Sequence, residues 1–169
     1  REKKYMLSPT EEALLARASQ ILEAPGEIFG ILSDADMAFD SIVNEKGETV
    51  PMSHAHFGVY LESRDARVRR DAFMSMYKTF GQFRNTCAAT LQNAVRVSTY
   101  NKNVRGFSTG REAALFKNAV PEAVYDSLVK AVNERLPLLH RYVSLRKRMM
   151  GVGELHSYDM YVPLVEEVD

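Results

Sequence analysis

The strongest constraint on the fold is a long amphipathic pattern in the middle of the chain. Between Arg64 and Asn101, seven apolar residues recur at intervals of three or four positions. That spacing places them on one face of an α-helix and leaves the opposite face polar. It predicts one long helix, capped by Ser63, whose apolar face packs on its neighbours. The seven residues are Phe73, Met76, Phe80, Phe83, Cys87, Leu91 and Ala94.

An earlier helix begins at a clear start signal. Ser8 and Glu11 have the spacing of a capping box, and Pro9 occupies the first helical position. An apolar stripe follows as far as Leu22. The Pro25-Gly26 pair predicts the end of this helix, and we expect a second, short helix over residues 27–33.

A third long helix is predicted over residues 121–151, with a short helical segment ("REAALF") before it. Pro137 lies inside this helix and should kink it, because proline removes one backbone donor and crowds the preceding turn. Gly151 can adopt the left-handed conformation that ends a helix. The apolar stripe of this helix is Val124, Leu128, Val132, Leu136, Leu139 and Val143.

A short β-hairpin is predicted between the first two helical regions. Ile42 and Val43 precede "NEKG", and Thr49 and Val50 follow it; a four-residue connection ending in glycine is typical of a hairpin. A helix over residues 53–61 should follow. The predicted fold is therefore mainly α, a multi-helix, bundle-like lobe with one small β-hairpin. We expect an N-terminal helical lobe over 1–62, with the hairpin at about 38–52, and a long-helix region over 63–169.

Charge and composition exclude several classes of function. Lys plus Arg and Asp plus Glu both number 22, so the formal net charge is zero, which disfavours nucleic acid as a partner. No apolar run approaches the roughly 20 residues needed to span a bilayer, so no membrane partner is expected. The basic clusters at 64–70 and 141–148 are interpreted as solvated helix faces. The single cysteine, Cys87, indicates a reducing, cytoplasmic setting and a packing role for its thiol.

The histidines do not form a metal-binding pattern. Helical zinc peptidases use His-Glu-x-x-His, in which two imidazoles four residues apart share one helix face. The four histidines are His54, His56, His140 and His156, and no two are four apart. His54 and His56 would point to different faces of a helix. We therefore predict no catalytic residue, no metal ligand and no cofactor within this chain.

The closing stretch, residues 153–169, gathers polar and aromatic side chains. One interpretation is a loop whose tyrosine rings cover a helix end. The other is a segment that lines or leads into an active-site cleft. The candidate cleft residues are His156, Tyr158, Asp159 and Tyr161.

Several stretches together resemble a known family of enzymes. They include "YMLSPTEEALLARAS", "GEIFGILSDADMAF", "HFGVYLESRDARVRRDAFMSMYKTF" and "LHSYDMYVPL". The chain resembles, over nearly its whole length, oligoendopeptidase F and the thimet-oligopeptidase-like (M3) zinc metallopeptidases. The resemblance implies an almost wholly helical fold, short peptides as substrates and zinc as the cofactor of the full-length parent.

The missing zinc motif departs from the family pattern. The resemblance then implies that this chain is a fragment upstream of an absent catalytic domain. It would form part of the helical wall of the substrate cleft and would be inactive alone. We also expect the isolated chain to self-associate, because severing a lobe exposes apolar surface. The alternative is a non-catalytic helical module that docks partner helices.

Overall fold

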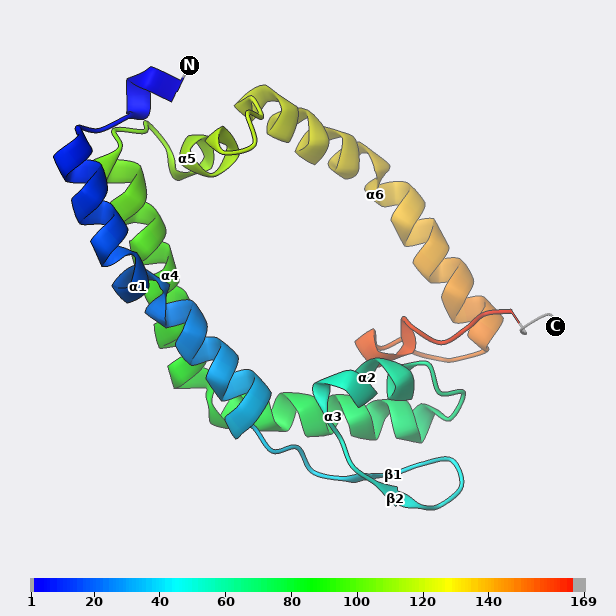
Figure 1. The fold of residues 1–169 in the computed structure, drawn as a ribbon. Helices are drawn as coiled ribbons and strands as arrows, with labels where there is room; N and C mark the ends of the chain where they lie inside the picture. The colour runs from blue at the N-terminus through cyan, green and yellow to red at the C-terminus, as the bar shows by residue number, and fades with distance from the viewer. Residues whose placement is uncertain (1, 166–169) are drawn as a thin grey trace. The chain divides into compact units, whose positions relative to one another are not determined.

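The computed structural model describes residues 2–165, which are predominantly helical (Figure 1). This confirms the mainly α class with one small hairpin. The helices are α1 Pro9–Ile31, α2 His54–Leu61, α3 Ala66–Gln82, α4 Arg84–Val104, α5 Gly110–Phe116 and α6 Glu122–Met150; the strands are β1 Ile42–Val43 and β2 Thr49–Val50. Short turns of 3-10 helix, η1 and η3, cover Glu2–Tyr5 and Ser157–Asp159, and a π-turn, η2, covers Leu32–Asp36.

The helix starts follow from local capping chemistry. The Ser8 hydroxyl accepts the Glu11 amide at 3.4 Å, and the Glu11 carboxylate accepts the Ser8 amide at 2.9 Å. These two bonds confirm the predicted capping box. The Ser53 hydroxyl likewise accepts the His56 amide at the start of α2, at 3.2 Å. Serine satisfies amide groups that the first helical turn leaves without a partner.

The predicted end of the first helix at Pro25-Gly26 is wrong. Helix α1 continues through Pro25 to Ile31 and passes directly into the π-turn. Proline costs this helix one hydrogen bond, because it has no N–H for the carbonyl four residues earlier. The half-buried Pro25 lines a groove formed by α1 and α4.

The single long helix predicted from Arg64 to Asn101 is also wrong. It is divided into α3 and α4 at Phe83, whose backbone (φ −99°, ψ 13°) leaves the helical region. The Phe83 amide bonds the Phe80 carbonyl at 3.1 Å, a three-residue step that ends a helix. The cap of α3 is Asp65, not Ser63: its carboxylate accepts the Arg67 amide at 2.8 Å.

The chain divides into two compact units, each built from two separate stretches. Unit 1 comprises residues 1–33 and 85–135, and unit 2 comprises residues 34–84 and 136–169. In unit 2 the hairpin pairs Ile42 with Val50 and Val43 with Thr49, as predicted. The hairpin and α2 lie against α3 (Figure 1). The core between them consists of Ile42, Met52, Val68, Ala72 and Met76.

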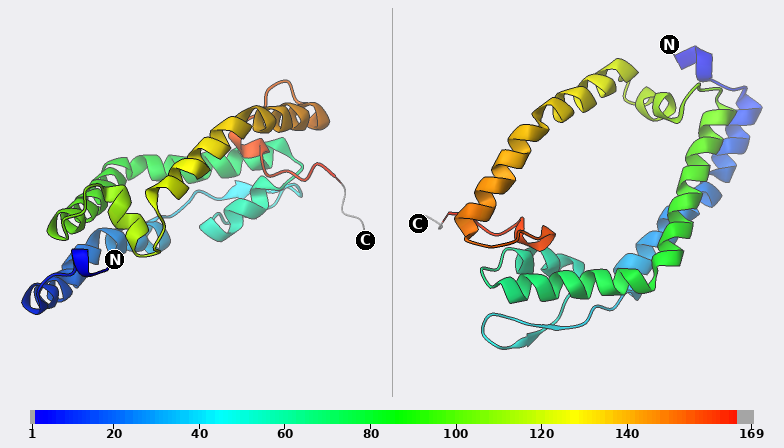
Figure 2. Two further views of the ribbon diagram at one scale, coloured as in Figure 1. Left: turned by 90° about the horizontal axis from the view of Figure 1, so that it is seen from above. Right: turned by 180° about the vertical axis from the view of Figure 1, so that it is seen from behind.

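In unit 1, α1 and α4 run side by side and antiparallel in every view (Figures 1 and 2). Arg105, just after α4, donates to both carboxylate oxygens of Glu12 at 2.8 and 3.0 Å. An aromatic cluster closes the same end: Tyr5 stacks on Phe107 at 4.0 Å and meets Phe116 edge-on. These contacts fix the start of α1 to the end of α4.

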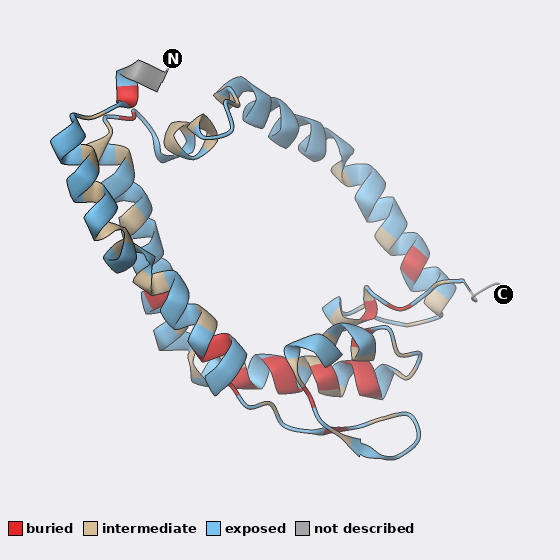
Figure 3. Cartoon of the chain, in the orientation of Figure 1, coloured by how far each residue is buried: buried red, intermediate tan, exposed pale blue. Residues whose placement is uncertain are grey.

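Burial is concentrated on α3, as Figure 3 shows. None of the residues of α1 is buried, and α6 buries only Arg146. The predicted stripe of α6 is largely exposed: Val124, Leu128 and Val132 are 54%, 61% and 54% exposed. Cys87 is half-buried on α4. No helix in the described part of the chain is long and apolar enough to cross a membrane.

Candidate functional site

The four predicted cleft residues lie in the segment that follows α6, within unit 2. Gly151 ends α6 with φ +65°, a conformation that favours glycine. The chain then forms η3, in which the Asp159 amide bonds the His156 carbonyl at 2.9 Å. The Asp159 carboxylate in turn accepts the His156 amide at 2.9 Å. The turn is therefore closed by reciprocal bonds between its first and last residues.

Asp159 forms a buried ion pair with Arg69 of α3. Its Oδ1 accepts Nη2 of Arg69 at 2.7 Å and Nε at 3.0 Å. Both residues are almost fully buried, at 3% and 2% exposure. The remaining Arg69 nitrogen, Nη1, donates to the carbonyls of Ser63 and Arg64 at 2.9 and 3.1 Å. The guanidinium thus joins η3 to the turn that precedes α3.

A second buried arginine, Arg146 of α6, holds the backbone of the same segment. Its Nε donates to the Asp159 carbonyl at 3.0 Å, and its Nη2 donates to the Val162 carbonyl. Arg146 is 4% exposed. Buried charges are tolerated when their donors are matched to acceptors. Among the described residues, no buried side-chain nitrogen or oxygen lacks a hydrogen-bond partner.

The aromatic members of the segment lie around this pair of anchors. Tyr158 meets Phe73 of α3 edge-on at 5.7 Å and lies 4.9 Å from the His156 ring. His156 is exposed and Tyr158 half-buried. Tyr161 is 62% exposed. Of the four predicted residues, His156, Tyr158 and Tyr161 therefore present surface to solvent, whereas the Asp159 carboxylate is enclosed and fully engaged within the protein.

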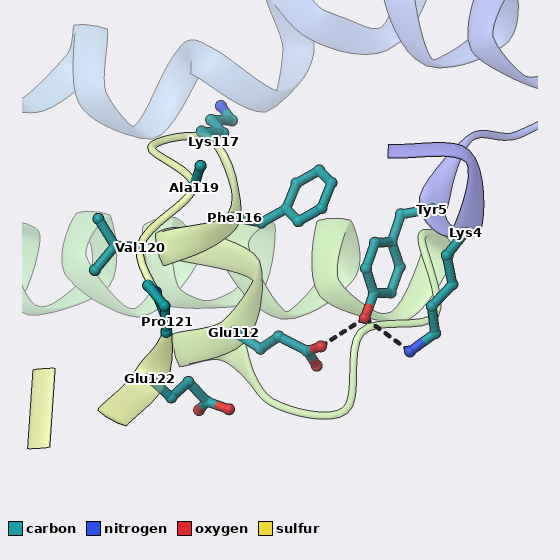
Figure 4. A pocket seen from close by; sticks show the side chains of 9 residues that line it. All are labelled: Lys4, Tyr5, Glu112, Phe116, Lys117, Ala119, Val120, Pro121 and Glu122. Atoms are coloured by element: carbon teal, nitrogen blue, oxygen red, sulfur yellow. Dashed lines mark hydrogen bonds between the residues drawn. The ribbon is translucent and has the colours of Figure 1, made fainter. Parts of the chain in front are cut away.

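A pocket of about 480 Å³ lies in unit 1, beside α5 (Figure 4). The Tyr5 hydroxyl donates to the Glu112 carboxylate at 2.5 Å, and Lys4 donates to the same hydroxyl at 2.9 Å. The bond from Tyr5, followed by the Ser108 amide, lowers the pKa of Glu112. Lys4, Tyr5 and Glu112 are thus bound to one another, which attaches the first described turn of the chain to α5.

Comparison with known proteins identifies the family. The family model described as Peptidase family M3 matches residues 59–168, more than half of the chain. The chain belongs to peptidase family M3. A second model, described as Oligopeptidase F, matches residues 1–39 of this M3 chain. Both findings confirm the resemblance seen in the sequence.

The relatives of this M3 chain are bacterial oligopeptidases. Oligopeptidase PepF of Bacillus subtilis is 45% identical over 167 residues, which are 99% of this chain and 25% of the relative. Group B oligopeptidase PepB of Streptococcus agalactiae is 46% identical over 96% of this chain and 27% of its own length. The crystal structure of oligoendopeptidase-F from Enterococcus faecium superposes with a TM-score of 0.95 at 45% identity, covering 98% of this chain and 33% of that one. This chain therefore spans about a quarter of the length of its curated relatives.

The described residues of this M3 chain do not form a site that fits a zinc ion. Within residues 2–165, no three His, Cys, Asp or Glu side chains come together in a group that could hold a metal. His54 instead meets the rings of Phe39 and Phe80 edge-on. Nδ1 of His56 forms a hydrogen bond of 3.2 Å with the Ser53 hydroxyl. No catalytic step through a metal can be derived from these residues.

The sequence interpretation missed the two residues that organise the segment. Arg69 and Arg146 both belong to the basic clusters interpreted as solvated faces, and the structure buries both. In each case the spacing of the arginine from apolar residues of its helix was the available indication that it can be buried. Arg69 lies three and four residues before Ala72 and Phe73 on the packed face of α3, and Arg146 lies three residues after Val143 in the stripe of α6. The same spacing also holds for the exposed Arg70 and Lys147, so it marks positions that can be buried without identifying which of them are.

Proposed function

We propose that this chain is part of a zinc-dependent oligoendopeptidase that hydrolyses short peptides. The observation that carries the proposal is the M3 match over residues 59–168, together with relatives that are named oligopeptidases and are about four times as long. In this proposal the chain supplies part of the helical wall of the substrate cleft. Residues 63–169 lead toward the catalytic domain, and the enzyme acts in the cytoplasm.

The proposal assigns the chain no catalysis of its own. The sequence lacks His-Glu-x-x-His, and no two of its histidines are four residues apart. The proposal therefore places the nucleophile and the proton transfers of peptide hydrolysis in polypeptide outside these 169 residues. Within the chain, the role that remains is to bind and orient the peptide. His156, Tyr158 and Tyr161 are the proposed contact residues, and Asp159 fixes the turn that carries them.

The test compares the chain alone with the longer product of the same reading frame. Both are purified and mixed with short peptides that carry a fluorophore and a quencher, with and without a metal chelator. We expect cleavage by the longer protein only, and we expect the chelator to stop it. Cleavage by the 169-residue chain that the chelator abolishes would refute the assignment of catalysis to other polypeptide. A downstream frame without His-Glu-x-x-His would refute the peptidase proposal itself.

A second candidate is a non-catalytic helical module that binds other proteins. The observation in its favour is the absence of buried residues in α1 and the exposure of the apolar stripe on α6. An amphipathic helix with an uncovered apolar face can dock a partner helix. The reading frame separates the two candidates: a stop codon directly after Asp169 favours the module, and a downstream zinc motif favours the peptidase.

A further inference from the structure

The closing segment is anchored at two points that flank its most exposed aromatic ring. The carbonyls of Asp159 and Val162 both accept hydrogen bonds from Arg146, and Val162 is 7% exposed. Met160 and Tyr161 lie between these anchors. The ring of Tyr161 is nevertheless 62% exposed. The segment thus presents an exposed ring from a backbone that a buried cation holds on both sides.

The side chain of Asp159 supplies the third anchor. Arg69 binds its carboxylate through two nitrogens, and the other carboxylate oxygen binds the His156 amide. Arg69 therefore fixes the orientation of η3, while Arg146 fixes the path of the chain after it. Neither arginine has a surface to offer to a ligand, because both are at least 96% enclosed.

We infer that Arg69 and Arg146 are positioning residues for peptide binding, and that they hold Tyr161 preorganised to pack on an apolar side chain of a short peptide. The inference rests on the proposed function. A ring held in place before binding loses little conformational freedom when it contacts a ligand, so preorganisation converts directly into affinity. The ligand class is a short peptide bearing an aliphatic or aromatic side chain at the contacted position.

Arginine is suited to this role in a way that lysine is not. A planar guanidinium donates in several fixed directions at once, which lets Arg146 bind two carbonyls three residues apart. A lysine ammonium at the same place keeps the charge, but it is a compact group that cannot direct hydrogen bonds to both carbonyls as the planar guanidinium does. The substitution Arg146→Lys therefore loosens the segment while it keeps the net charge of the site.

The alternative is that the two arginines only stabilise the fold. In that case their replacement would lower stability and reduce the active fraction, with no dependence on Tyr161. A double-mutant cycle distinguishes the two readings, because residues that act through one another give effects that do not add. The cycle is measured as KM and kcat in the longer peptidase, with the variants Y161A, R146K and the two combined.

We expect Y161A to raise KM about tenfold with kcat changed less than about twofold. This pattern means that the variant has lost an interaction made equally with the bound peptide and with the transition state. Tenfold in KM corresponds to about 1.4 kcal/mol. R146K should raise KM about fivefold, and the double variant should be no weaker than Y161A alone.

Matched controls lie next to each arginine. Arg70 and Arg148 are exposed neighbours on the same helices, so R70K and R148K repeat the chemical change outside the anchors and should leave KM unchanged. R69K provides the same test at the second anchor. Amide exchange at His156 and Asp159, whose N–H groups close the turn, should accelerate in R146K and R69K only.

The outcomes separate this inference from the proposed function. A longer protein without peptidase activity refutes the proposed function. An active enzyme in which Y161A leaves KM unchanged overturns the inference, and this result needs no arginine variant. Additive effects of Y161A and R146K also overturn it, since they would leave Arg146 a purely structural role.

Discussion

At the residue scale, the buried ion pair of Arg69 with Asp159 differs in kind from the ion pairs on the surface. Two ions lose their hydration on burial, so removal of one partner leaves an uncompensated charge in a poorly solvated site. Exposed pairs are screened by water and contribute little. Unit 2 contains both types: besides the buried pair, Lys78 binds Asp40 at 2.5 Å with both side chains more than 60% exposed.

We predict that Asp159→Asn lowers the free energy of unfolding by about 3 kcal/mol or more, whereas Asp40→Asn lowers it by less than about 1 kcal/mol. Both variants replace a carboxylate by its amide, so they differ chiefly in burial. Denaturant unfolding followed by circular dichroism measures both. The double variant Arg69→Met with Asp159→Leu, which removes both charges, should recover part of the loss. Equal losses at the two positions would contradict the assignment.

The acidic groups of unit 1 predict a dependence of stability on pH. The hydrogen bond from Arg105, followed by that from the Leu7 amide, lowers the pKa of Glu12 from its ordinary value in the folded protein. A carboxyl with a lowered folded pKa stabilises the fold fully above its unfolded pKa and loses that contribution as the pH falls through the folded value. The contribution of Glu12 should therefore be complete at neutral pH and be lost in acid, as the pH falls through the lowered pKa of Glu12.

The measurement is the unfolding midpoint as a function of pH for the wild type and for Glu12→Gln. We expect the glutamine variant to show a shallower fall in stability as the pH falls through the lowered pKa of Glu12, because the amide has no proton to bind. Glu23→Gln is the matched control, since Glu23 is an exposed glutamate on the same helix. Parallel curves for the wild type and Glu12→Gln would rule out this source of acid sensitivity.

At the scale of elements, the sequence predicted helices where local chemistry decides them. The serine caps at Ser8 and Ser53 and the hairpin around Asn44 depend on residues within a few positions of one another, so they can be read directly. The division of the helix at Phe83 could not be predicted, because the apolar spacing from Phe80 to Cys87 continues across a single non-helical residue. The continuation of α1 through Pro25 was not predicted either, because a proline inside a helix costs one hydrogen bond but does not always end the helix.

The candidate site shows the same division between local and distant causes. The aromatic composition of the closing stretch marked His156, Tyr158 and Tyr161 from the sequence alone. The enclosure of Asp159 could not be predicted in this way, because its partner Arg69 lies 90 residues earlier. Only the tertiary fold reveals that pairing.

The exposed stripe of α6 predicts association of the isolated chain. Val124, Leu128 and Val132 are more than half exposed and share one helix face. Contiguous apolar surface of this kind drives association when nothing covers it. Replacing all three by glutamine, which retains good helix propensity, should convert a concentration-dependent oligomer into a monomer in sedimentation velocity. Lys130→Gln with Glu134→Gln, which leaves the net charge unchanged, is the control. A wild type that stays monomeric at the highest concentration would contradict the prediction.

At the scale of the whole molecule, the two compact units are each assembled from stretches far apart in sequence. Unit 2 owes its core to the hairpin, α2 and α3, while unit 1 depends on the pairing of α1 with α4 and on the ring cluster at Tyr5. The stabilising contacts named above each lie within one unit. Distant, independent sites affect stability additively, so damage to one unit should not be transmitted in full to the other.

We therefore predict that each of the two units can lose stability without an equal loss in the other. Hydrogen exchange read by mass spectrometry should show faster exchange in α3 and η3 of Asp159→Asn, and unchanged exchange in α1 and α4. At neutral pH, Glu12→Gln should differ from the wild type in α1 and α4 and not in α3, and the difference should vanish as the pH falls through the lowered pKa of Glu12. The physical reason is that each variant removes a contact from one cooperative unit, and exchange reports the opening of that unit alone. A uniform rise in exchange across residues 2–165 in either variant would mean that the chain unfolds as one cooperative body.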